Sequence, residues 1–529
     1  MVSLDVLLYD TTLRDGAQRE NLSFSVEDKI RIAAKLAEFG IHYIELGFPH
    51  SNPKDTELFR RIRKLDLKPA RLVAFGSTRY KANRVEEDPN IRALIEGRMD
   101  AICIFGKSWD FHVEKVLETT LEENLKMIYE SVCYLKENSP EVIYDAEHFF
   151  NAYKSDQEYA LKTILAAQEG GADYIVLCDT NGGTLPSEVS RITREVVDLL
   201  KVPVGIHAHN DIECAVANTL VAVENGATMV QGTINGYGER CGNANLCSII
   251  PNLVLKKGIL CLPKENLRRL TDLSHFVSEV ANIVPDSHQP YVGQSAFAHK
   301  GGMHVSAVQK DSRAFEHINP LEVGNHQKIV VSELSGKGTI VSKAREFGLD
   351  LSKDPLLAAK ILQEIQNLEH IGYHFEAADG SFELLVRELT GTARHYFTLE
   401  SFRVIMEKRE DGDVVTEATI KIHVGGQRII VTAEGNGPVN ALDNALRDAI
   451  GQAYPQLSKI RLSDFKVRVI DEKKGTAAVV RVVIDTTDGK DSWGTVGVHE
   501  NIIEASWEAL VDSIIYGLMK MEGEGAASE

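Results

Sequence analysis

Two histidines that are separated by a single residue end an apolar run of the chain, in the segment VPVGIHAHND. Side chains on a β-strand alternate between its two faces, so the imidazoles of His207 and His209 are predicted to point the same way. Neutral imidazoles that converge in this manner are common ligands of a divalent metal. The alternative is a pair that packs in the core or meets by chance, so the interpretation depends on which other residues reach the same place.

Two oxygen-bearing side chains could complete such a metal site. Asp15 follows the first apolar run, in YDTTLRDGAQ, and Asn243 lies in the glycine-rich segment GYGERCGN. With the histidines they offer two nitrogen and two oxygen ligands and leave coordination positions open, which suits Mg²⁺, Mn²⁺ or Zn²⁺. A 2-oxo acid would fill those positions through its carboxylate and ketone oxygens, and the metal would polarise the ketone. Asp15 alone could instead pair with Arg14 or cap a turn.

Three more polar residues follow apolar runs and could act on a substrate. Arg14 could stabilise a developing oxyanion, or it could form a structural ion pair. Glu147 could orient a base or a water molecule, or it could be an ordinary carboxylate at the rim of a site. Thr180 could bind a substrate carboxylate through its hydroxyl group, or it could cap the helix predicted to begin near Pro186. The residues alone leave both interpretations open.

His304 and Cys241 offer a base and a nucleophile. His304 lies in HKGGMHVSAV, whose glycines predict a loop that enters a helix, and a histidine there could be a general base or an ordinary loop residue. Cys241, in GERCGN, could be a catalytic thiol. The sequence places no histidine beside it, and a small buried residue is the alternative.

The scaffold that would hold these residues is predicted by short apolar runs that alternate with helix-like segments to about residue 260. The runs cover residues 6–9, 43–46, 71–77, 101–108, 141–150, 174–183, 202–211 and 229–238. Eight β-then-α units predict an α/β fold with a (β/α)₈ TIM barrel rather than an open sheet. Most of the polar candidates stand at strand ends, where the carboxyl ends of the strands form the active site of such barrels.

One barrel helix carries clear start and stop signals. Residues 25–39 have apolar side chains at helical spacing, with Ser25 as a predicted N-cap and Asp28 at the position that completes a capping box. Gly40 is expected to end this helix.

The remainder of the chain divides by its patterning. We expect the barrel domain in residues 1–275, helical accessory subdomains in 276–390, a C-terminal α+β domain in 391–520 and a disordered tail in 521–529. In the C-terminal domain, alternating strand-like segments are followed by a helix-like segment, first up to residue 454 and again up to residue 520. This pattern predicts an internal duplication of a strands-then-helix unit.

Composition and charge argue against several classes of protein. The formal net charge of −19 argues against a nucleic-acid partner. The seven cysteines lie between Cys103 and Cys261 without a CxxC pair, which suits a reducing compartment and indicates neither a zinc ribbon nor a redox motif. No apolar run approaches the roughly 18 residues that cross a bilayer, and the N-terminus lacks the basic region of a signal peptide. We therefore expect a soluble, cytoplasmic protein with no membrane partner.

Several motifs resemble those of one enzyme family. DTTLRDGAQ, HAHND and GYGERCGN are similar to motifs of the α-isopropylmalate, homocitrate and citramalate synthases, which belong with hydroxymethylglutaryl-CoA lyase to a wider group of metal-dependent barrels. ENLSFSVEDKI, FGKSWDFHV, YDAEHFFNAY and KGGMHVSAVQKD resemble the citramalate synthase branch. The resemblance spans nearly the whole chain and is most specific in residues 9–250.

The resemblance implies a Claisen-type acyltransferase. It would condense acetyl-CoA with pyruvate and water to give (R)-citramalate and CoA, the first step of a threonine-independent route to isoleucine, with feedback inhibition by isoleucine bound to the C-terminal allosteric domain. The resemblance implies a divalent metal (Mn²⁺, Mg²⁺ or Zn²⁺), and a homodimer or larger assembly in which the segment around His304 reaches the partner's barrel. The implied metal ligands are Asp15, His207, His209 and Asn243, the catalytic residues are Arg14, Glu147 and His304, and the substrate contacts are Arg14, Gln18, Tyr144 and Thr180.

One residue departs from the family pattern, and three other functions stay open. Many family members carry a tyrosine where this chain has Phe315, so the hydroxyl group near the implied base is missing here. The same chemistry on 2-oxoisovalerate would make the protein an isopropylmalate synthase. A rival from another enzyme class is a lyase that cleaves its substrate through Cys241. A non-enzymatic rival is an amino-acid sensor with an inactive barrel.

Overall fold

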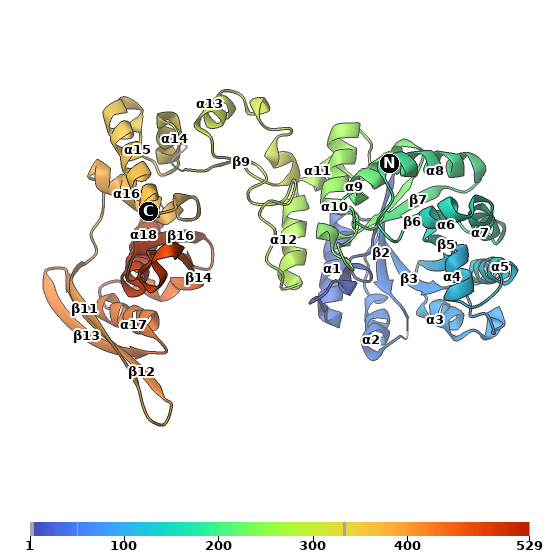
Figure 1. The fold of residues 1–529 in the computed structure, drawn as a ribbon, viewed down its shortest axis with the longest axis horizontal. Helices are drawn as coiled ribbons and strands as arrows, with labels where there is room; N and C mark the ends of the chain where they lie inside the picture. The colour runs from blue at the N-terminus through green and yellow to red at the C-terminus, as the bar shows by residue number, and fades with distance from the viewer. Residues whose placement is uncertain (1–4, 50, 332–334, 528–529) are drawn as a thin grey trace. The chain divides into compact units, whose positions relative to one another are not determined.

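The computed structural model describes residues 5–49, 51–331 and 335–527, and the chain forms two compact units (Figure 1). The first unit comprises Met1–Phe297 and His317–Gln327. The second comprises Ala298–Glu316 and Lys328–Glu529. None of the helices in the described part of the chain is both long and apolar enough to cross a membrane.

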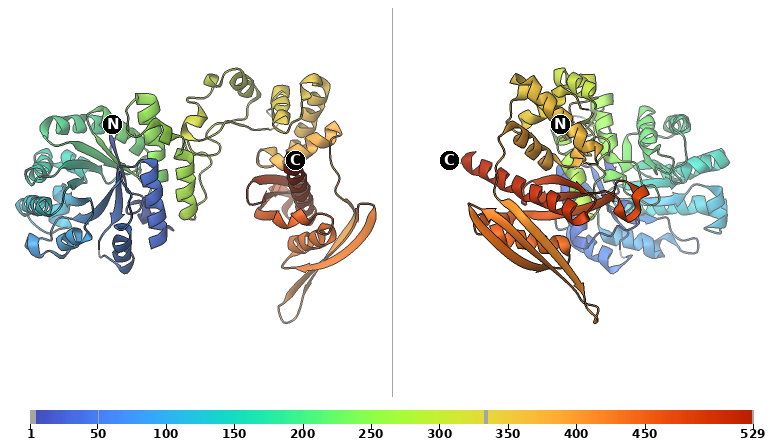
Figure 2. Two further views of the ribbon diagram at one scale, coloured as in Figure 1. Left: turned by 180° about the vertical axis from the view of Figure 1, so that it is seen from behind. Right: turned by 60° about the vertical axis from the view of Figure 1, so that its left-hand side comes forward.

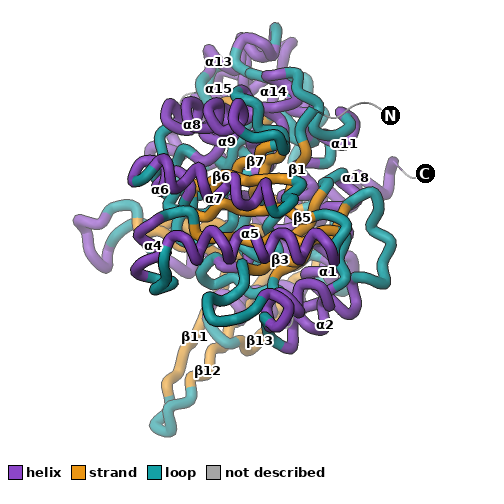
Figure 3. The backbone as a smooth tube through the Cα atoms, turned by 90° about the vertical axis from the view of Figure 1, so that its right-hand side faces the viewer, coloured by secondary structure: helices purple, strands orange, loops and turns teal. Residues whose placement is uncertain are grey.

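The first unit is built around a closed barrel of eight parallel strands in chain order, and β8 pairs with β1 through Leu7 and Met229. The strands are β1 Leu7–Asp10, β2 Tyr43–Gly47, β3 Arg71–Ser77, β4 Ala101–Lys107, β5 Val142–Glu147, β6 Tyr174–Asp179, β7 Val204–Ala208 and β8 Met229–Gly232. The helices α5 to α8 lie outside the strands in the view of Figure 3. The predicted (β/α)₈ barrel is therefore confirmed.

The helices of this unit connect successive strands and extend the chain beyond β8. They are α1 Val26–Phe39, α2 Pro53–Ile62, α3 Pro89–Gly97, α4 Asp110–Lys115, α5 Leu121–Asn138, α6 Phe149–Ser155, α7 Gln157–Glu169, α8 Pro186–Leu199, α9 Ala215–Glu224, α10 Leu246–Pro251, α11 Lys264–Leu267 and α12 Leu270–Val280. The capping box of Ser25 and Asp28 is present at α1, and Gly40 ends that helix with a φ of 107°. A positive φ of this size favours glycine because it has no Cβ.

Alternate residues of every barrel strand except β7 contribute to two different apolar clusters. One cluster inside the barrel contains Tyr9, Phe75, Ile143 and Cys178, among others. The larger cluster between strands and helices contains their sequence neighbours, including Tyr144. This alternation decides which polar residues of a strand can reach the interior of the barrel.

The second unit begins with helices and a short pair of strands. Its helices before the C-terminal sheets are α13 Gly302–Lys310, α14 Lys337–Glu346, α15 Pro355–His370 and α16 Asp379–Thr390, and the parallel strands are β9 Ala298–His299 and β10 Lys328–Ile329. The region predicted as accessory, 276–390, contributes to both units, since residues 276–297 and 317–327 group with the barrel. Residues 317–327 contact residues 276–297 through the side-chain amide of Asn325, which donates to the carbonyls of Tyr291 and Gly293 at 2.9 Å.

The C-terminal part repeats one arrangement, as the sequence predicted (Figure 2). Two antiparallel three-stranded sheets, each followed by a helix, share one apolar core. The first set is β11 Thr398–Lys408, β12 Val414–Val424, β13 Gln427–Gly435 and α17 Pro438–Ile450, and the second is β14 Arg461–Val469, β15 Val480–Thr487, β16 Ser492–His499 and α18 Ile502–Ala527.

Helix α18 differs from the prediction of a disordered tail that begins at residue 521, because it continues to Ala527. Ile514 and Leu518 of this helix are fully buried in the shared core. Once such packing has nucleated a helix, each added turn costs little, even in the sequence EGEGAA. Residues 528 and 529 lie outside the described residues.

Candidate active site

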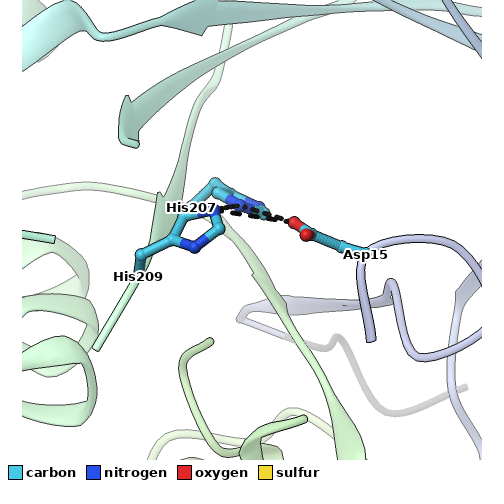
Figure 4. Close-up of side chains that lie close together, drawn as sticks. All are labelled: Asp15, His207 and His209. Atoms are coloured by element: carbon cyan, nitrogen blue, oxygen red, sulfur yellow. Dashed lines mark hydrogen bonds and ion pairs between the residues drawn. The ribbon is translucent and has the colours of Figure 1, made fainter. Parts of the chain in front are cut away.

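Asp15, His207 and His209 meet at the carboxyl end of the barrel, and Figure 4 shows their side chains pointing toward one another. The Nε2 atoms of His207 and His209 lie 3.2 and 3.7 Å from Asp15 Oδ2, and they lie 3.3 Å from each other. All three side chains are at least nine-tenths buried. Their ligand atoms lie within 4.8 Å of one another, close enough to bind a single metal ion.

Asn243 joins this group through its amide. Its Nδ2 donates to Asp15 Oδ2 at 2.9 Å and lies 3.4 Å from His207 Nε2, and a β-bridge links its backbone to that of His209. The amide oxygen is buried and has no hydrogen-bond partner among the described residues. Because an amide can be turned to exchange its oxygen and nitrogen, Asn243 can offer this oxygen as the fourth ligand.

The charges of the group suit a cation. Burial alone would raise the pKa of Asp15, but the Arg14 guanidinium and the hydrogen bond with His207 outweigh it and lower that pKa well below its usual range. Burial and the neighbouring His207 lower the pKa of His209 to about 4, so this imidazole is neutral at pH 7. For His207, burial favours the neutral form, but Asp15 outweighs it and raises the pKa. An ionised carboxylate beside a neutral imidazole is a donor set that fits a divalent metal.

Arg14 is held beside this group by a buried network. Its Nε donates to Glu45 Oε1 at 2.6 Å, and one of its terminal nitrogens lies 3.4 Å from Asp15 Oδ2. Glu45 also accepts from the Tyr9 hydroxyl at 2.6 Å. The guanidinium stacks over the Phe75 ring, 3.8 Å from its centroid. Arg14 therefore has a fixed orientation, and N–H groups remain that can reach a substrate oxygen.

A cavity of about 260 Å³ opens onto these residues. Its walls are formed by Arg14, Asp15, Gln18, Phe48, Phe75, Phe105, Asp145, Glu147, Cys178, Thr180, His207, His209, Glu239 and Arg240. Seven of the ten predicted site residues thus line one cavity, and Asn243 contacts two of them.

Glu147 and Thr180 reach the cavity from the ends of β5 and β6. Glu147 Oε2 lies 2.5 Å from the ammonium of Lys107, its register partner on β4. The Thr180 hydroxyl accepts from the backbone N–H of His148 at 2.9 Å. The hydroxyl proton of Thr180 therefore remains available to a ligand, and Leu185, not Thr180, occupies the N-cap position of α8.

Tyr144 does not reach the cavity. It is fully buried in the cluster between strands and helices, and an added Cβ on Gly106 would lie 2.5 Å from its hydroxyl oxygen. One step along a strand reverses the face, so the neighbouring Asp145 lines the cavity in its place. We therefore leave Tyr144 out of the substrate contacts.

His304 and Cys241 remain to be placed among the predicted site residues. His304 is exposed on α13 of the second unit, where its ring centroid lies 4.2 Å from that of Phe315. Its part in the reaction stays a prediction. Cys241 is exposed in the loop between β8 and α10 and does not line the cavity.

Other residues of the site were missed from the sequence. Gln231 lies 2.9 Å from His207 Nδ1 and donates a hydrogen bond to Asp145. Glu45 orients Arg14. Lys107 orients Glu147. A signal was available for all four, since each stands within or at the end of a predicted strand. Their pairing across different strands, however, appears only in the folded barrel.

Comparison with known proteins matches almost the whole chain. A model of the HMGL-like family matches residues 5–277, the homocitrate synthase post-HMGL domain-like model matches residues 291–372, and the model of the LeuA allosteric (dimerisation) domain matches residues 376–518. A protein of Aquifex aeolicus named (R)-citramalate synthase is 56% identical over 98% of this chain and 99% of its own. One of the same name from Geobacter sulfurreducens is 56% identical over 98% of each chain. A probable 2-isopropylmalate synthase of Methanopyrus kandleri is 32% identical over 96% of this chain and 97% of its own.

Proposed function

This chain belongs to the HMGL-like family, and from that premise we propose that it condenses acetyl-CoA with pyruvate and water to give (R)-citramalate and CoA. The chain is an acyltransferase of this family. The observation that carries the proposal is the buried group of Asp15, His207 and His209 at the wall of a small cavity. The names and near-complete overlap of the two relatives at 56% identity support the choice of substrates.

A divalent metal (Mn²⁺, Mg²⁺ or Zn²⁺) would be held by Asp15, His207, His209 and Asn243. When bound, such a metal polarises the ketone of the keto acid. The N–H groups of Arg14 would donate to the ketone oxygen as negative charge develops on it. The Thr180 hydroxyl would donate to the substrate carboxylate, and Gln18 offers an amide at the same wall.

Carbon–carbon bond formation requires a proton to leave the methyl group of acetyl-CoA. Glu147, oriented by Lys107, and His304 would take part in this transfer. The methyl carbon then attacks the ketone carbon, and the former ketone oxygen becomes the hydroxyl group of the product. Hydrolysis of the thioester by water releases CoA and makes the overall reaction irreversible.

The aromatic side chains in the cavity wall favour a small keto acid. Phe48, Phe75 and Phe105 form part of its walls, and successive rings lie 5.3 and 5.6 Å apart between centroids. Pyruvate carries a methyl group where 2-oxoisovalerate carries an isopropyl group, so the larger keto acid would crowd such walls. We therefore prefer citramalate to isopropylmalate as the product.

The second unit would supply regulation and assembly. The match to the LeuA allosteric (dimerisation) domain supports a homodimer or larger assembly and an allosteric ligand. Isoleucine is the ligand and feedback inhibitor that we propose. On α13, His304 is exposed beside Met303 (84% exposed) and near Phe315 (49% exposed). Such apolar exposure supports the proposal that this helix docks on another surface, the barrel of a partner subunit. We place the enzyme in the cytoplasm.

The test is thiol release from acetyl-CoA in the presence of Mn²⁺ with four keto acids: pyruvate, 2-oxobutanoate, 2-oxoisovalerate and 2-oxoglutarate. We expect the highest kcat/KM with pyruvate, by about tenfold or more over 2-oxoisovalerate, the discrimination that one or two methyl groups can give against an aromatic wall. Faster release with 2-oxoisovalerate would make the protein an isopropylmalate synthase. No release with any keto acid would contradict the proposed condensation.

A further inference from the structure

Gln231 lies beneath the predicted metal ligands and is fully buried inside the barrel. It stands on β8 as the register partner of His207 on β7. Its Oε1 lies 2.9 Å from His207 Nδ1, and its Nε2 donates to Asp145 Oδ1 at 3.0 Å. Both ends of its amide are therefore engaged, one by a histidine and one by a carboxylate from β5.

The chemistry of Asp145 fixes the direction of this chain of hydrogen bonds. An ionised carboxylate only accepts, so the atom of Gln231 that faces Asp145 must be the NH₂ group. The amide oxygen then faces His207, and an oxygen only accepts, so His207 must carry its proton on Nδ1. A neutral imidazole protonated on Nδ1 has its lone pair on Nε2, the atom that lies 3.2 Å from Asp15.

We propose that Gln231, oriented by Asp145, is a positioning residue that holds His207 in the tautomer and ring orientation required for metal binding through Nε2. The inference rests on the metal site of the proposed function. Metal-binding histidines are commonly oriented by a partner on the second ring nitrogen, and loss of that partner typically weakens metal binding by about 10- to 100-fold. Here the partner is a neutral amide, so the hydrogen bonds that link Asp145 to His207 run through Gln231.

The test measures Mn²⁺ affinity without any substrate, from the electron paramagnetic resonance signal of free Mn²⁺. Gln231→Met keeps the length and volume of the side chain but removes the acceptor. We expect the dissociation constant for Mn²⁺ to rise by about 10- to 100-fold in this variant. Met229→Leu, on the same strand and also fully buried, is the matched control and should bind Mn²⁺ like the unchanged protein.

Two variants of Asp145 test the orienting step. Asp145→Asn keeps an oxygen that can accept from Gln231, whereas Asp145→Ala does not. We expect the alanine variant to lose more Mn²⁺ affinity than the asparagine variant. Combining Asp145→Ala with Gln231→Met should weaken binding little beyond Gln231→Met alone, since both act through His207.

The inference is overturned if Gln231→Met binds Mn²⁺ within about twofold of the unchanged protein while its circular dichroism spectrum is native. It is also overturned if Asp145→Asn binds as weakly as Asp145→Ala. Since no keto acid or thioester is present, these outcomes are independent of the proposed reaction. If the metal affinities change as expected but no condensation is detected, the positioning role stands and the proposed function fails.

Discussion

At the scale of the residue, the site depends on four side chains that converge from three parts of the chain. Asp15 follows β1, His207 and His209 stand at the end of β7, and Asn243 follows β8. The spacing of the two histidines correctly indicated that they share a direction, and their Nε2 atoms lie 3.3 Å apart. Such close approach of nitrogen and carboxylate oxygen atoms requires either a shared proton or a shared cation.

Replacement of His207 by alanine tests the proposed cation. We expect His207→Ala to lose Mn²⁺ binding and to lower kcat/KM by roughly a thousandfold or more, since metal polarisation contributes several kcal/mol to the transition state. Calorimetry with Mn²⁺ and thiol release with pyruvate measure the two effects. Exposed His288, replaced in the same way, serves as the control. An active His207→Ala enzyme would rule out this histidine as a ligand.

The site residues also show which individual side chains of the site could be predicted from the sequence and which could not. Seven of the residues selected by motif resemblance line the cavity, whereas Tyr144, which was selected as well, is buried in the cluster between strands and helices. A motif fixes sequence position only, whereas a strand assigns neighbouring residues to opposite faces. Asp145 and Gln231 were missed because their roles come from contacts between strands that are 86 residues apart in the chain.

At the scale of the element, local signals predicted the structure well where they were strong. The capping box at Ser25, the end of α1 at Gly40 and the eight barrel strands were confirmed. The pair β9 and β10 was not predicted, because each strand has two residues and no periodicity. Helix α18 extends into the expected tail because its stability comes from burial along its earlier turns, which local composition does not report.

Helix α18 also carries an acidic residue that makes stability depend on pH. Burial raises the pKa of Asp512 to about 7, although the Ser381 hydroxyl donates to it at 2.6 Å. The unfolded chain loses this proton near pH 4. Between about pH 4 and pH 7 the folded protein thus binds the proton more tightly, so this group's contribution to stability falls as the pH rises and is constant above that range.

Asp512→Asn removes this titration. We expect the melting temperature of the variant, relative to that of the unchanged protein, to rise steadily between pH 5 and pH 7 and to level off above pH 7.5. The corresponding slope is at most about 1.4 kcal/mol per pH unit. Thermal melts across the pH range, with the exposed Asp411→Asn as control, measure the difference. A difference that does not change with pH would contradict the raised pKa.

At the scale of the whole molecule, the chain combines a barrel unit, which carries the predicted metal ligands, with a second unit, which carries His304. The duplicated sheets and helices of the second unit have their own apolar core, distinct from that of the barrel. Because the second unit has its own core, it could hold a ligand site of its own. Inhibition by isoleucine, the proposed end product, would suit the condensation, since hydrolysis of the thioester makes that step irreversible.

Isoleucine should therefore bind whether or not the barrel is active. We expect isoleucine to lower the rate of thiol release with pyruvate. We expect His207→Ala to bind isoleucine with an affinity within about twofold of the unchanged protein, because His207 belongs to the barrel unit and the proposed isoleucine site to the second unit. Calorimetric titration with isoleucine, with alanine as the control ligand, measures this. If isoleucine neither binds nor inhibits, the assignment of the second unit as its receptor is wrong.

The reaction that we propose joins the methyl carbon of acetyl-CoA to the ketone carbon of pyruvate. The most direct test supplies acetyl-CoA labelled with ¹³C in its methyl group, together with pyruvate and Mn²⁺, and follows the carbon spectrum. We expect the label to appear in the methylene carbon of citramalate, and we expect His207→Ala to form no labelled citramalate. Label recovered only as acetate, or in a product without a new carbon–carbon bond, would contradict it.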